Sequence, residues 1–112
     1  MEIIEILKSL GDLNRLRILN ILRKFQKSCN CDLEEVLELN QSNASRHITK
    51  LRKDNLIVFE KVGKWSYYSI DDESLEKYPF IVELLDSLDA DIFLKDIEKF
   101  SIFKEKKERC SN

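Results

Sequence analysis

The chain has 112 residues, of which 43% are hydrophobic, and a formal net charge of −2 at pH 7. This length and composition predict a single domain over residues 1–112, and the slight acidity weakly disfavours nucleic-acid binding. No run approaches the roughly 18 apolar residues of a membrane span, so we expect a cytoplasmic protein that does not bind membranes.

The first part of the chain predicts two helices separated by Gly11. The first helix ends at this glycine, and Asp12 begins the second. Apolar residues recur at helical spacing in both, namely Ile3, Ile4, Leu7 and Leu10 in the first and Ile18, Ile21, Leu22 and Phe25 in the second. Each helix therefore has a face suited to burial in the core.

Two cysteines, Cys29 and Cys31, come directly before a predicted helix-turn-helix. The chain has three cysteines, an odd number that cannot all pair within one chain, so we expect thiols available to metals or redox chemistry. Residues i and i+2 of an ideal helix project about 200° apart. The two sulfurs can therefore share one ion only if their backbone is not helical.

The predicted helix-turn-helix spans residues 32–55. A short helix, Leu33 to Leu39, is followed by a turn and by a second helix whose N-cap is predicted to be Ser42. The second helix presents amide, hydroxyl and cationic groups that can bind base edges and phosphates in a major groove. The predicted DNA-contacting residues of this helix are Ser42, Asn43, Ser45, Arg46, His47, Lys50 and Lys53.

Charge along the chain agrees with this interpretation. Residues 41–64 contain six Lys or Arg against two acids, whereas residues 65–112 contain seven against twelve. Phosphate contacts need a local excess of cations, because an acidic region farther off is screened beyond about 8 Å. The alternative is that these charges only solvate helix faces.

Two β-rich runs, Ile57 to Val62 and Lys64 to Ile70, flank Gly63. They predict a hairpin over 57–70 with Lys61 and Lys64 at its tip as further DNA contacts. A helix-turn-helix followed by such a hairpin is the winged-helix pattern. The expected fold class is thus mainly α with a small β-hairpin.

The remaining segment is predicted to be helical, with Pro79 at a first helical position. Two apolar stripes follow, Ile81, Leu85 and Leu88 and then Phe93, Ile97, Phe100 and Phe103. These phenylalanines exceed the need of so small a core. We therefore expect residues 1–11 and 79–109 to form a homodimer interface. The alternative is that both segments only cover their own subunit.

The segment from Leu7 to Ile70 resembles the ArsR/SmtB family of metal-responsive transcriptional repressors. The matching stretches are LKSLGDLNRLRILNIL, CNCDL, QSNASRHITKLRKDNLI and EKVGKWSYYSI. The resemblance implies a homodimeric winged-helix repressor, not an enzyme, that binds double-stranded operator DNA and releases it when an inducer binds.

Within that family, the segment CNCDL is similar to the corresponding segment of the arsenic/antimony and cadmium/lead sensing branches. In those branches, cysteines at this position bind the inducer. Soft sulfur ligands select soft ions, so the implied inducer is As(III) or Sb(III), favoured over Cd or Pb, with no organic cofactor. The arsenic pattern has a third cysteine where this chain has Glu34. The predicted metal ligands are Cys29, Cys31 and Cys110, with Asp32 or Glu34 as oxygen donors for a divalent ion.

Three alternatives stay open at the level of sequence. The cysteines could sense oxidants or persulfides, they could be vestigial, or the chain could regulate DNA without any inducer.

In the metal hypothesis, ligation holds or forces an irregular backbone at Cys29 and Cys31, which changes the orientation of the DNA-reading helix. About 1.4 kcal/mol of differential affinity would lower DNA binding tenfold.

Overall fold

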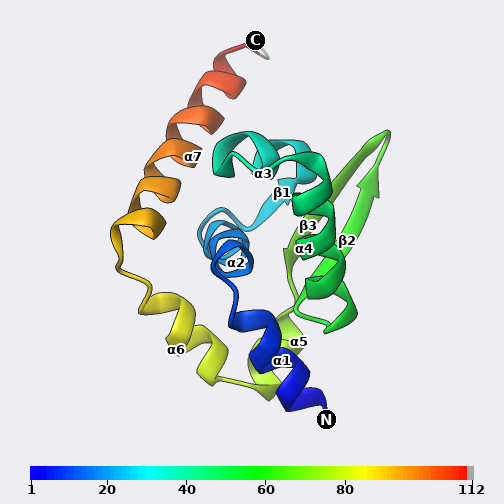
Figure 1. The fold of residues 1–112 in the computed structure, drawn as a ribbon. Coiled ribbons are helices and arrows are strands. Elements are labelled where there is room, and N and C mark those ends of the chain that lie inside the picture. The colour runs from blue at the N-terminus through cyan, green and yellow to red at the C-terminus, as the bar shows by residue number, and fades with distance from the viewer. Residues whose placement is uncertain (111–112) are drawn as a thin grey trace.

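The computed structural model describes residues 1–110, with side chains described for residues 1–107. Helix α2 lies at the centre, between α7 on one side and α4 with the β2–β3 hairpin on the other (Figure 1). The elements are α1 Glu2–Leu10, α2 Leu13–Phe25, β1 Lys27–Cys29, α3 Asn30–Leu37, α4 Gln41–Lys53, β2 Ile57–Val62, β3 Trp65–Ile70, α5 Asp72–Lys77, α6 Phe80–Asp86 and α7 Asp91–Cys110.

The two N-terminal helices form as predicted, but α1 uses a different face. Ile6 and Leu10 are buried in the core, whereas Ile4 and Leu7 are exposed. The predicted stripe is thus divided between the core and the surface, and the expected role of its exposed residues in a homodimer interface stays a prediction. Asp12 caps α2 by accepting a hydrogen bond from the Arg15 amide, as its position predicted.

Helices α3 and α4 form the predicted helix-turn-helix. Glu38 ends α3 in the left-handed conformation, with φ 55°, and its amide bonds the carbonyls of the preceding turn. The predicted N-cap of the second helix was wrong: Asn40, not Ser42, accepts from the Asn43 amide, so the helix begins earlier. Asn and Ser are equally good caps, and sequence alone does not rank them.

The sheet is antiparallel, with strand order β1-β3-β2. The hairpin predicted over 57–70 is present as β2 and β3, and Gly63 turns it with φ 62°, a conformation that favours glycine. Strand β1 was not predicted, since three residues are too few to show alternation. It pairs Cys29 with Tyr67 and so fixes the first cysteine to the sheet. The expected winged-helix fold, mainly helical with a small sheet, is confirmed.

Helix α7 packs along α2 and α3. Phe93 and Phe100 are buried within this chain, and the Phe100 ring lies 4.8 Å from that of Phe25. These two rings therefore supply core to their own subunit, as the alternative interpretation expected, and a homodimer interface elsewhere on the segment stays a prediction. Among the described residues, none of the helices is both long enough and apolar enough for a membrane span.

Candidate metal centre and nucleic-acid interface

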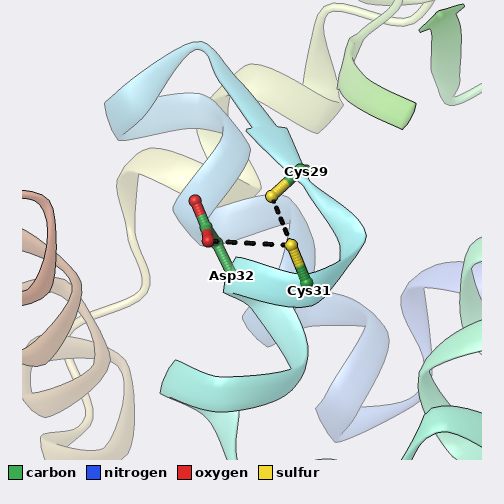
Figure 2. Close-up of side chains that lie close together, drawn as sticks. All are labelled: Cys29, Cys31 and Asp32. Atoms are coloured by element: carbon green, nitrogen blue, oxygen red, sulfur yellow. Dashed lines mark hydrogen bonds between the residues drawn. The ribbon is translucent and has the colours of Figure 1, made fainter. Parts of the chain in front are cut away.

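Cys29 and Cys31 meet at the junction of β1 and α3. Cys29 is extended, with φ −80° and ψ 158°, and precedes the first residue of α3. Because of this break, the two side chains point toward each other (Figure 2), and their Sγ atoms are 2.9 Å apart. The expectation that close sulfurs require a non-helical backbone is confirmed. An ion at this position would thus hold an irregular backbone that the fold already has, one of the two possibilities that the sequence left open.

Asp32 completes a cluster of three potential ligands. Its Oδ1 lies 3.9 Å from the Sγ of Cys31, and one ligand atom from each of the three residues falls within 4.8 Å of the others (Figure 2). Two sulfurs and one carboxylate oxygen fit a thiophilic ion. Glu34, the other predicted oxygen donor, instead accepts a hydrogen bond from the Asn30 side chain.

The two thiols differ in environment. Cys29 is buried and Cys31 is exposed. Burial raises the pKa of the Cys29 thiol to about 12, and the neighbouring Cys31 thiol and Asp32 carboxylate add to the rise. A thiol with such a pKa is protonated at neutral pH, so a bound ion would displace its proton. The same protonation disfavours the Cys29 sulfur as a nucleophile toward oxidants.

Lys107 of α7 reaches across to the cluster. Its Nζ lies 2.9 Å and 3.0 Å from the two carboxylate oxygens of Asp32, and this contact raises the pKa of Lys107. Sequence analysis missed this residue, because nothing in the pattern connects positions 75 residues apart. The C-terminal part of α7 therefore touches the candidate metal centre directly.

Two further links join α7 to α3. Lys99 forms an ion pair of 2.9 Å with Glu38, the residue that ends α3. Arg17 of α2 binds both oxygens of Asp96, at 2.8 and 3.0 Å, and donates to the carbonyl of Leu37. The thiol-bearing helix is thus held against α7 at both of its ends.

Helix α4 presents a polar face to solvent. Its inward face consists of Ala44, His47, Ile48 and Leu51. Five of the predicted DNA-contacting residues are exposed, Ser42, Asn43, Ser45, Arg46 and Lys53. The predicted residues Lys61 and Lys64 are exposed near the tip of the hairpin, which lies on the same side of the molecule as α4 (Figure 1). Their contact with DNA stays a prediction.

The side chains of His47 and Lys50, two further residues of α4 predicted to contact DNA, have partners within the chain. His47 is only 2% exposed, and the Arg15 guanidinium lies 3.2 Å from its Nδ1. Burial lowers the pKa of His47, so a neutral ring accepts this hydrogen bond. Lys50 forms ion pairs of 3.0 Å with Glu5 and 2.9 Å with Asp54. Both side chains connect α4 to the N-terminal helices instead of pointing to solvent.

Cys110, the third predicted metal ligand, has a side chain outside the described residues. Its backbone ends α7. In sequence it follows Lys107 by three positions.

The fold defines a winged-helix protein of the helix-turn-helix class, with a thiol pair at the start of the helix that precedes α4. Residues 12–58 match the family described as "Bacterial regulatory protein, arsR family". The chain belongs to this family, as its resemblance predicted.

Two curated relatives are resistance regulators. The "Arsenical resistance operon repressor" of Bacillus subtilis is 44% identical over 68 residues, 61% of this chain and 65% of that protein. The "Cadmium resistance transcriptional regulatory protein CadC homolog" of Staphylococcus aureus is 31% identical over 77 residues, 69% of this chain and 64% of that protein. The chain thus spans just under two thirds of these relatives. Both are regulators, in agreement with the prediction that this chain is not an enzyme.

Solved structures of regulators share the fold of this chain. The transcriptional regulator HlyU of Vibrio vulnificus is 31% identical, with a TM-score of 0.64 over 78% of this chain and 86% of that one. A winged helix-turn-helix domain from Mycobacterium bovis, titled homodimeric, has a TM-score of 0.65 over 79% of this chain and 82% of that one. It is 21% identical, so it supports the fold alone.

Proposed function

We propose that the chain is a transcriptional repressor that releases operator DNA when a thiophilic metal or metalloid ion binds Cys29 and Cys31. The single observation that carries this proposal is the 2.9 Å contact between the two sulfurs beside Asp32. The helix that begins there packs against the DNA-reading helix α4. A ligand at the junction is therefore placed to bias the position of α4.

As(III) or Sb(III) is the proposed inducer class, ahead of Cd or Pb. Sulfur ligands suit all four ions, and the two curated relatives are an arsenical and a cadmium regulator. The described residues place two sulfurs together. A third sulfur from Cys110, of this subunit or of a partner, is part of the proposal.

DNA release after arsenite addition tests this function. The probe is a fluorescein-labelled duplex selected by the wild-type protein from a random-sequence pool. We expect arsenite to weaken wild-type binding at least about tenfold, which corresponds to ~1.4 kcal/mol of coupling, and to change binding by the Cys29→Ser/Cys31→Ser variant less than about twofold. Fluorescence anisotropy measures both.

Cys110→Ser tests the proposed third ligand, because it removes that thiol and leaves the contacting pair. Loss of the response in this variant would make Cys110 a ligand, and a retained response would restrict the site to the pair. Release of the double variant by arsenite as readily as the wild type would contradict the proposal. Release by a mild oxidant or a persulfide, but by no ion, would establish a redox regulator instead.

We propose that the exposed face of α4 enters the major groove, with Arg46 as a principal contact. Arg46 is exposed beside Ser42 and Asn43 near the start of the helix, the part that reads bases in such proteins. Arg46→Ala is expected to weaken duplex binding about tenfold and, if the contact is to phosphate, to lower the salt slope by about 1. Anisotropy at several salt concentrations measures both quantities.

Lys95→Ala is the control for Arg46→Ala, because it removes an exposed cation from α7 without touching α4. The Lys95→Ala variant should bind the duplex with the same affinity as the wild type. Equal affinities for the Arg46→Ala and Lys95→Ala variants would remove Arg46 from the interface.

We also propose a homodimer that uses the exposed apolar residues of the N-terminal helices and of α7. Ile4, Leu7 and Leu13 are exposed in one part of the chain, and Leu94 and Ile102 in α7. In the proposed dimer a second copy covers these side chains, since contiguous exposed apolar patches mark interaction surfaces. Sedimentation equilibrium tests the proposal, and a monomer at the concentrations used for DNA binding would contradict it.

A further inference from the structure

The ammonium group of Lys107 occupies the carboxylate that a bound ion would otherwise use. Its Nζ lies within 3.0 Å of both Asp32 oxygens, and the Asp32 side chain is only 14% exposed. Among the described residues, Asp32 is the one additional ligand grouped with the two cysteines. An ion can therefore bind the two sulfurs without breaking an ion pair, whereas it can bind the Asp32 carboxylate only if the Asp32–Lys107 ion pair breaks.

Resting on the proposed inducer function, we propose that Lys107 determines the specificity of the thiol pair. By holding Asp32, it favours trivalent arsenic or antimony, which enters as a neutral hydroxide, over a divalent cation. A divalent ion such as Cd²⁺ seeks further ligands beyond two thiolates, and it approaches against the positive charge of Lys107.

The chemistry of the neutral species needs no carboxylate. Arsenous acid, As(OH)₃, condenses with the Cys29 and Cys31 thiols to form two As–S bonds. Each thiol proton leaves with one hydroxide as water, so two waters form, one hydroxyl stays on arsenic and no electrons are transferred. The Asp32–Lys107 ion pair can persist throughout.

A divalent ion follows a different course at the same residues. It displaces both thiol protons to solvent and gains a third ligand only if Asp32 leaves Lys107. The ion pair is partly exposed, with Lys107 52% accessible, so breaking it has a modest cost. We expect a selectivity effect of about fivefold, which corresponds to ~1 kcal/mol.

Replacement of Lys107 by methionine tests the proposal. Lys107→Met is expected to raise Cd²⁺ affinity about fivefold and to leave arsenite affinity within about twofold of the wild type. Chelator competition measures Cd²⁺ affinity through the thiolate absorbance, and dithiol competition measures arsenite affinity. Lys106→Met is the matched control, because Asp32 pairs with Lys107 and not with this neighbouring lysine of α7, so both affinities should stay unchanged.

A double-mutant cycle assigns the effect to the Asp32–Lys107 pair. In the Asp32→Asn background, Lys107→Met should no longer change the preference, since the contested ligand is gone. If the ratio of the Cd²⁺ affinity to the arsenite affinity is the same in Lys107→Met as in the wild type, the inference is overturned and the proposed function is left intact. Failure of both ions to bind the wild-type thiols would overturn both.

Discussion

Asp96→Ala is expected to destabilise the chain by about 3 kcal/mol, a large part of the 5–15 kcal/mol typical of a domain. Asp96 is 2% exposed and binds Arg17 through both carboxylate oxygens. Without it, the guanidinium stays buried with only the carbonyl of Leu37 and the Asn14 side chain as partners. Urea unfolding at fixed protein concentration, followed by circular dichroism, measures the change.

Glu38→Ala is the matched control for the Asp96 variant. It also removes a carboxylate that joins α7 to another helix, but both members of the Glu38–Lys99 pair are well exposed. Solvent screening limits the effect of such a pair to about 0–1 kcal/mol. Equal losses in the two variants would show that the Arg17–Asp96 pair has no special structural role. Replacing both Arg17 and Asp96 with apolar residues should recover part of the stability, because no buried charge is then left alone.

The helix-turn-helix and hairpin were predictable because their signals are local. Apolar spacing defined α2 and α4, and Gly63 supplied the conformation that a tight hairpin turn favours. The close contact of Cys29 and Cys31 depended on a strand of three residues that pairs with distant β3. The spacing of the two cysteines shows that close sulfurs require a non-helical backbone. Only the fold shows that the backbone at Cys29 is extended.

The two sulfur ligands of the candidate site could be proposed from the sequence, whereas the residues that contact the site from other helices could not. Lys107 and Asp32 meet through the packing of α7 on α3, and no local pattern encodes that contact. The partners of His47 and Lys50 within the chain were unpredicted for a related reason. Both types of side chain bind DNA in many proteins, but here α1 and α2 supply partners that draw them away from the exposed face of α4.

Phe100→Ala is expected to destabilise the chain by about 3–5 kcal/mol, because the Phe100 side chain is fully buried between Phe25 and Phe103. Phe59→Ala, the same substitution at a ring that is 40% exposed on β2, should cost less than about half as much. Urea unfolding at several protein concentrations separates core from interface. A loss from a core position stays constant with concentration, whereas a loss that shrinks as concentration rises would return Phe100 to a subunit interface.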